Sequence, residues 1–210
     1  MEKNELKYNL DSLYEGTEAP WGLEPDPLVE RAVTYLTGNT VLDLGSGDGR
    51  NSLFLAQKGF KVTAVDLSSE AIRQLNQRMS NFQANSAAVV ADIADFDFPK
   101  DMDNIICTLV LHYLEPPEAK TVLHKIATSV TRSNSIVVLE SFTNQGQLMP
   151  RNNSGYWPNR SELTKFFEAN GFETVYYNVQ NHLTLQKDAA GKSCIHEVEE
   201  IIFRRSILSI

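Results

Sequence analysis

The chain has 210 residues, of which 42% are hydrophobic and 22% charged, a composition typical of a globular protein. At this length we expect one domain over residues 1–210, with residues 1–25 as an N-terminal lid segment and residues 26–210 as its core. The formal net charge of -8 and the lack of any dense run of Lys and Arg argue against nucleic acid as a partner.

No apolar run approaches the roughly 20 residues that span a bilayer, and the start, MEKNELKYNLDSLYEG, contains no apolar targeting segment. We therefore expect a cytoplasmic protein with no membrane contact. Cys107 and Cys194 form neither a CxxC pair nor a His/Cys cluster at metal-ligand spacing. The sequence therefore predicts neither a disulfide framework nor a metal site.

The first elements form a helix followed by a strand, a tight turn and a second helix. Residues 26–38 predict the first helix, because Asp26 can cap it and Pro27 suits the first helical position. A short apolar strand at residues 40–44 leads into the turn GSGDG, and residues 50–59 predict the helix that follows.

The pattern of strand and helix then repeats. Further strands are predicted at residues 61–66, 86–92, 104–111, 135–141, 172–179 and 196–205, and further helices at residues 69–81, 117–131 and 161–171. Residues 104–111 are apolar throughout, which places this strand in the middle of a sheet covered on both faces. The last two strands flank a turn at residues 188–191 and should pair antiparallel.

This alternation predicts an α/β protein, three-layer α-β-α and Rossmann-like, with a mostly parallel sheet and right-handed crossovers. Ligands in such proteins bind beyond the carboxyl ends of the strands, where the winding direction reverses. The site is therefore expected among residues 43–50, 66, 92 and 109–114.

The glycine turn lies in the stretch VLDLGSGDGRN at residues 41–51. Gly45 and Gly47 let a ligand approach the main chain, and the next helix points its N-terminal N–H groups at the turn, which favours an anionic group. A dinucleotide fingerprint would carry its third glycine later than Gly49.

The acid before the turn indicates the charge of the ligand. Asp43 would repel a diphosphate in a poorly solvated crevice but suits a ligand that bears positive charge. S-adenosylmethionine (SAM) has a carboxylate for the helix end and an ammonium and a sulfonium for acids. SAM is therefore the predicted ligand.

Two further acids end the next two strands. Asp66 is placed to accept hydrogen bonds from ribose hydroxyls, and Asp92 to accept one from the adenine amino group. Taken alone, Asp66 could merely cap the following helix and Asp92 could be a turn residue. With Asp43 they form three acids at the tips of three successive strands, which supports one shared site.

The motifs DLGSGDG, AVDLS and ADI resemble the signature of class I SAM-dependent methyltransferases, over residues 40 to about 140. Within that superfamily, LDLGSGDGRNSLFLAQKGFKVTAVDLSSEAI is similar to the tellurite-resistance (TehB-like) and thiopurine methyltransferase branch. The resemblance implies a seven-stranded sheet whose last strand is antiparallel. It also implies SAM as cofactor, bound by Asp43, Gly45, Ser46, Gly47, Arg50, Asn51, Asp66, Leu67, Asp92, Ile93 and Leu109.

The acceptor side is less specific. Methyl transfer from a sulfonium needs alignment and exclusion of water, and needs a base only when the acceptor must lose a proton. His112 could be that catalytic base or a packing residue. Trp21 could lie over the sulfonium or fix the lid segment to the core. The candidate substrate contacts are Tyr14, Trp21, Tyr113, Arg151, Tyr156 and Trp157.

The sequence thus predicts a SAM-dependent methyltransferase acting on a small-molecule acceptor, either a soft S, Se or Te anion or a small metabolite. Near the C-terminus, Leu185 with Gln186 beside it stands where the tellurite-resistance family tends to carry a histidine, so the resemblance does not extend to tellurite specificity. The alternatives are a non-catalytic SAM-binding regulatory module and an NAD-dependent oxidoreductase, which Asp43 and the early Gly49 disfavour. Oligomeric state is not predicted.

Overall fold

The computed structural model describes residues 3–17, 19–79, 86–146, 155–187 and 193–206. Its strands are β1 Thr40–Leu44, β2 Lys61–Asp66, β3 Ala87–Val90, β4 Asn104–Thr108, β5 Ile136–Gly146, β6 Phe172–Lys187 and β7 Ser193–Arg205. They form a seven-stranded sheet in the order β3-β2-β1-β4-β5-β7-β6. β1 to β5 run parallel, and β7 is antiparallel to both β5 and β6. The predicted fold class and the antiparallel last strand are confirmed.

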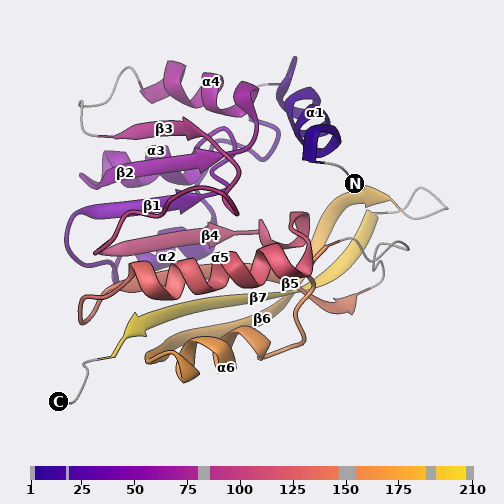
Figure 1. The fold of residues 1–210 in the computed structure, drawn as a ribbon. Helices are drawn as coiled ribbons and strands as arrows, with labels where there is room; N and C mark the ends of the chain where they lie inside the picture. Colours follow the sequence, from indigo (N-terminus) through magenta and orange to yellow (C-terminus); the bar gives the residue numbers. More distant parts are fainter. Residues whose placement is uncertain (1–2, 18, 80–85, 147–154, 188–192, 207–210) are drawn as a thin grey trace.

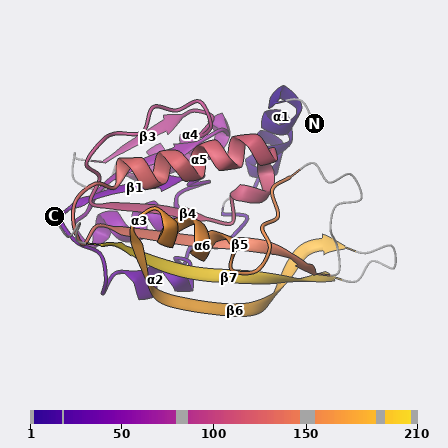
Figure 2. The same cartoon turned by 60° about the horizontal axis from the view of Figure 1, so that its bottom comes forward.

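Helices cover both faces of this sheet. The described residues form α1 Lys3–Tyr14, α2 Pro27–Ala32, α3 Arg50–Gln57, α4 Ser69–Met79, the 3-10 helix η1 Leu111–Tyr113, α5 Pro116–Ser129 and α6 Glu162–Ala169. α5 and α6 lie on one face and α2 and α3 on the other (Figures 1 and 2). Apolar side chains are buried in both layers, with Phe167 and Phe203 in the first and Leu28 and Leu55 in the second. No helix in the described ranges is long and apolar enough to cross a membrane.

Several element boundaries differ from the predicted ones. The helix expected over residues 26–38 ends at Ala32, where the chain continues in turns such as Tyr35 N to Ala32 O, 2.8 Å. The strand expected over residues 104–111 ends early because Leu109 adopts a positive φ of 54° and η1 follows. β5, β6 and β7 are each longer than predicted. The predicted turn at 188–191 lies outside the described residues.

The lid segment, for which no helix was predicted, contains α1. Asp11 joins it to α4, since its carboxylate accepts hydrogen bonds from Ser68 Oγ at 2.6 Å and Glu70 N at 3.1 Å. Gln74 Nε2 also donates to Tyr14 O at 2.8 Å. A half-buried acid therefore caps α4 from a neighbouring helix. This docking places the end of α1 beside the carboxyl ends of the central strands (Figure 1).

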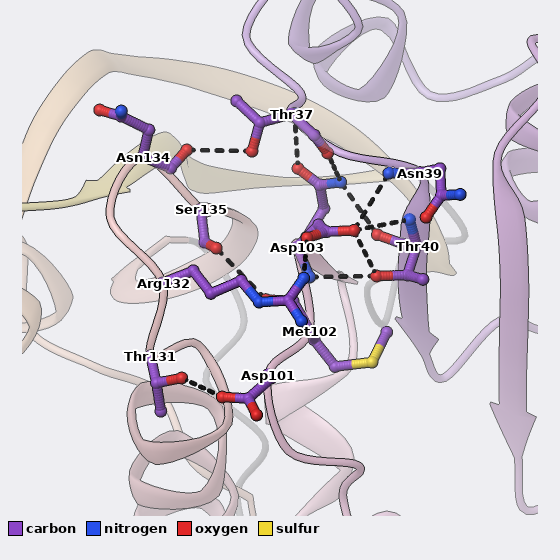
Figure 3. A network of polar contacts seen from close by, with 11 residues as sticks. Thr37, Asn39, Thr40, Asp101, Met102, Asp103, Thr131, Arg132, Asn134 and Ser135 are labelled. Carbon is purple, nitrogen blue, oxygen red and sulfur yellow. Dashed lines mark hydrogen bonds and ion pairs between the residues drawn. The ribbon is translucent and has the colours of Figure 1, made fainter.

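A polar network closes the opposite ends of the strands (Figure 3). Asp103 accepts hydrogen bonds from Asn39 N at 3.0 Å and from Thr40 N at 3.1 Å and Oγ1 at 2.8 Å, and it pairs with Arg132 at 2.9 Å. Burial alone would raise the pKa of Asp103, but these hydrogen bonds outweigh it and hold the pKa below its usual value. The network fixes the start of β1 against the start of β4.

Candidate functional site

A cavity of about 530 Å³ opens at the carboxyl ends of β1, β2 and β4, within the size range of small-molecule sites. It brings together almost all of the predicted site residues. Those that line it are Tyr14, Trp21, Gly45, Ser46, Gly47, Arg50, Asn51, Asp66, Leu67, Asp92, Ile93, Leu109, His112, Tyr113 and Trp157. The strand tips named from the sequence therefore meet around one space.

The loop after β1 can only be built with glycine at two positions. Gly45 has a φ of +66°, and a Cβ there would lie 2.3 Å from a methyl group of Val110. Gly47 has a φ of +55°, and a Cβ there would lie 2.7 Å from the Tyr14 hydroxyl. Both positions are strained for other residues, and both border the cavity. We call this loop the glycine cradle, because a side chain at Gly45 or Gly47 would fill the space beside its backbone.

Asp66 shapes this cradle as well as lining it. Its carboxylate accepts hydrogen bonds from Gly47 N and Ser68 N, each at 2.8 Å. Burial raises the pKa of Asp66 despite these two bonds, because they compensate only part of its lost hydration. Asp92 likewise lines the cavity while accepting a hydrogen bond from Ala94 N at 2.8 Å. Both acids therefore accept hydrogen bonds from a local turn and also line the cavity.

Asp43 is the exception among the predicted acids. It does not line the cavity, and its side chain is buried behind the glycine loop. It accepts a hydrogen bond from Ser52 Oγ at 2.6 Å, and burial raises its pKa to about 6. Asp43 is therefore absent from the cavity lining, because β1 carries the side chain under the loop, and its contact with a ligand stays a prediction.

Two predictions cannot be placed. Arg151 lies outside the described part of the structure, and so do the side chains of Leu185 and Gln186. Tyr156 is described but lies away from the cavity lining, with its hydroxyl donating to Glu162 at 2.8 Å. Tyr156 is therefore removed from the candidate substrate contacts.

Arg50 binds an acid that sequence reasoning took only for a helix cap. Asp26 does accept a hydrogen bond from Leu28 N at 2.9 Å, as that prediction required. Its other oxygen lies 3.1 Å from the Arg50 guanidinium, and its backbone N–H donates to Asn51 at 2.8 Å. Asp26 thus joins the start of α2 to the start of α3 at the cavity wall.

Glu140 on β5 lies beside this ion pair. It is 3% exposed, and one of its oxygens has no hydrogen-bond partner within the described structure. Burial, the neighbouring Asp26 and then Glu200 raise the pKa of Glu140. The Glu140 carboxyl therefore stays protonated at pH values where an ordinary glutamate is ionised, and its O–H donates a hydrogen bond to Asp26.

The remaining wall is an aromatic cluster, which we define as His112, Phe142, Trp157 and His196. Phe142 and Trp157 stack with ring centroids 5.6 Å apart, and His112 meets Phe142 edge-on at 4.9 Å. His196 lies 5.2 Å from Phe142 and 5.6 Å from Trp157. Burial, with a contribution from His196, lowers the pKa of His112 to about 3, so its imidazole is neutral and a weak base.

Sequence reasoning missed half of this cluster. Phe142 and His196 come from the long strands β5 and β7, whose alternation predicts burial but not a shared cavity. His182, which opposes His196 in the β6–β7 register, also lines the cavity and was also missed. Within the described residues, no group of three or more His, Cys, Asp or Glu side chains could hold a metal ion.

Comparison with known proteins shows which family part of the chain resembles. Residues 41–133, which include the glycine loop, Asp66 and Asp92, match the family model described as "Methyltransferase domain". This segment, somewhat under half of the chain, is therefore similar to that family. The matched segment includes the glycine-loop side of the cavity and ends before Phe142, Trp157 and His196.

The chain also resembles named relatives over part of their length. It is 32% identical over 103 residues to a probable SAM-dependent methyltransferase TehB of Haemophilus influenzae, covering 48% of this chain and 36% of that relative. The chain thus spans about a third of that protein. It is 29% identical to an uncharacterized methyltransferase of Mycobacterium tuberculosis, over 67% of each chain. The crystal structure of TehB from H. influenzae superposes with a TM-score of 0.74 at 21% identity, covering 85% of this chain and 61% of that one, which supports the fold.

Proposed function

We propose that this methyltransferase domain binds SAM against the glycine loop and transfers its methyl group to a small acceptor held at the aromatic cluster. One observation carries this proposal: a single cavity of about 530 Å³ is bordered both by the glycine cradle and by the cluster. Donor and acceptor could therefore meet without leaving the protein. When bound, SAM supplies an electrophilic methyl group on a sulfonium.

The donor side of the proposal follows the chemistry of its residues. Gly45 and Gly47 leave the backbone open to the methionine part, and Arg50 borders the same space. The Asp66 carboxylate has remaining acceptor capacity for ribose hydroxyls, since it receives only two backbone N–H groups. Asp92 with Ile93 would take the adenine. Asp43 would act indirectly, holding α3 through Ser52.

The chain's own contribution to the transfer is alignment and exclusion of water. Tyr14 and Trp21 line the cavity from the N-terminal segment, joined by a hydrogen bond from Trp21 Nε1 to Tyr14 Oη at 3.2 Å. Because the His112 imidazole is neutral and weakly basic, we assign it to shaping the acceptor side rather than to proton removal. The acceptors compatible with such a site are those that attack without a strong protein base, either soft sulfur, selenium or tellurium anions or small metabolites.

Calorimetric titration with SAM and with its demethylated product tests the donor site. We expect binding of both at micromolar concentrations, and no binding of either at tens of micromolar would contradict the proposal. Binding without methyl transfer to any acceptor in a panel of thiols, amines, phenols, selenite and tellurite would favour the regulatory-module alternative.

Two matched glycine variants test whether SAM binds at the glycine cradle. Gly45→Ala forces a Cβ onto Val110, whereas Gly59→Ala has the same kind of strained φ, +93°, with nothing within 4 Å. Backbone strain is therefore common to both variants, and only the first one also crowds the loop. We expect SAM affinity to fall at least tenfold for Gly45→Ala and to stay within about twofold for Gly59→Ala.

A further inference from the structure

The aromatic cluster brings rings to the cavity from four separate parts of the chain. His112 is in η1, Phe142 in β5, Trp157 in the segment before α6 and His196 in β7. All four line the cavity. Aromatic faces carry partial negative charge and attract cations. The cluster alone therefore favours a ligand group that bears or gains positive charge.

The charges around the cavity point the same way. Its lining contains five carboxylates, those of Asp26, Asp48, Asp66, Asp92 and Glu118. Asp26 pairs with Arg50 and Asp48 with Arg78, and among the described residues of the lining Arg50 is the one Lys or Arg side chain. Burial lowers the pKa of both His112 and His196, so these rings add no positive charge at neutral pH. An anionic acceptor would therefore meet no lysine and no unpaired arginine in this lining.

Hydrogen-bonding groups of the cluster are left for a ligand. Three buried nitrogens have no partner within the described structure, namely His112 Nδ1, Trp157 Nε1 and His196 Nε2. His196 is 1% exposed, so solvent does not replace the missing bond. Neutral imidazole offers one N–H and one lone pair, and the lone pair can accept a hydrogen bond from a substrate N–H.

We propose that the acceptor is a small amine, methylated on nitrogen with its nitrogen-bearing group among His112, Phe142, Trp157 and His196. This inference rests on the proposed methyl transfer from SAM. The acceptor reacts as its free base, formed when the ammonium ion that predominates in neutral solution gives a proton to water. Its nitrogen lone pair forms the N–C bond, the C–S bond of the sulfonium breaks, and that electron pair stays on sulfur as a neutral thioether. The product leaves as a methylammonium ion, the charged form of such an amine at neutral pH.

Charge balance explains why the cluster suits this reaction. During transfer to an amine the positive charge moves from sulfur to nitrogen and is never lost. Aromatic rings and carboxylates stabilise that charge in the transition state and in the product. With an anionic acceptor the charges of the two reactants would cancel, and the same carboxylates would instead repel the incoming acceptor.

Matched acceptors test this inference after SAM binding has been measured by calorimetry. The probes are benzylamine and ethanolamine as amines, phenylmethanethiol as the sulfur analogue of benzylamine, and tellurite as the inorganic anion. We expect N-methylated product by mass spectrometry, with kcat/KM for an amine at least tenfold above that for the thiol. Methylation of thiol or tellurite but of no amine would overturn the inference, as would no amine product from a protein that binds SAM. Absence of SAM binding would instead overturn the proposed function.

Two substitutions of one ring test its placement. Trp157→Leu removes the aromatic face, whereas Trp157→Phe keeps a face but removes the indole N–H. A cation–π contribution in the transition state predicts a fall of about 3- to 30-fold in kcat/KM for the amine with Leu and a smaller fall with Phe, with SAM affinity unchanged in both. Equal kcat/KM values in both variants and the parent protein would overturn the placement, and so would a loss confined to SAM affinity.

Discussion

Buried carboxylates lie at both ends of the parallel strands, but their surroundings differ. At the end away from the cavity, Asp103 receives hydrogen bonds from Asn39, Thr40 and Arg132, and its pKa is lowered (Figure 3). At the cavity end, Asp66 receives two backbone N–H groups and its pKa is raised by burial.

The comparison separates acids that stabilise the fold from acids that keep hydrogen-bonding capacity for a ligand. A buried carboxylate with all its bonds made stabilises the protein, whereas one with bonds missing costs stability until a ligand supplies them. Glu140 also has an unpartnered oxygen and a raised pKa, but it lies outside the cavity lining. Equivalent substitutions at the two ends should therefore affect different properties.

The largest effect on stability is expected from Asp103→Asn. An amide cannot keep the Arg132 ion pair and the bonds from Asn39 and Thr40 together, so the free energy of unfolding should fall by about 3 kcal/mol near neutral pH. Because the folded-state pKa is lowered, this loss should shrink as pH falls through that pKa. Urea unfolding at several pH values measures it, with exposed Asp97→Asn as the control. A weakened affinity for SAM in folded Asp103→Asn protein would break the comparison.

Asp66→Asn should show the opposite pattern. Its burial cost is removed while part of its hydrogen bonding to the cradle is lost, so stability without ligand should change by under about 1 kcal/mol. Loss of a charged acceptor for the ribose should weaken SAM binding by about 2 kcal/mol, or roughly 30-fold. Calorimetry alongside thermal unfolding of the same sample decides between the two effects. An unchanged dissociation constant would mean that the ribose is placed wrongly.

Glu140→Gln should stabilise the protein at alkaline pH. Since the folded-state pKa of Glu140 is raised, its favourable contribution is complete below the unfolded pKa and is lost as pH rises through the folded one. A glutamine amide can donate to Asp26 at every pH, so we expect a gain of about 1 kcal/mol at pH 8 that disappears near pH 5. Thermal melts across this range test it, with exposed Glu173→Gln as the control. A gain that is equal at both pH values would contradict the assignment.

The smallest effect is expected from His112→Gln. The pKa of His112 falls to about 3 on folding from an ordinary 6.5, so the unfolded chain binds a proton below pH 6.5 that the folded protein does not. Stability is therefore lost as pH falls, and the substitution should recover under about 1 kcal/mol at pH 5.5 and nothing at pH 8. Exposed His124→Gln should leave the acid slope unchanged. An unaltered slope in His112→Gln would show that the ring takes up its proton normally.

Local patterns explain why the sequence could name the residues on the glycine-loop side of the cavity. The glycine turn, Asp66 and Asp92 each sit at the tip of a strand, and the tips of adjacent parallel strands necessarily meet at one edge. The orientation of Asp43 was not predictable from this pattern, because the strand's alternation and the loop's path together decide whether a side chain enters the cavity or lies beneath the loop. The extra helix α1 was missed because its docking on α4 through Asp11 stabilises a segment with little periodicity of its own.

The amino-acid sequence by itself determined the order of strands and helices along the chain and the glycine cradle, since these depend on residues close together in the chain. Only the tertiary structure decided that His112, Phe142, Trp157 and His196 share one wall and that two of their imidazoles are neutral there. The physical reason is that this cluster joins β5, β7, η1 and the segment before α6. Its formation depends on sheet order and burial, which the spacing of its residues along the chain does not reveal.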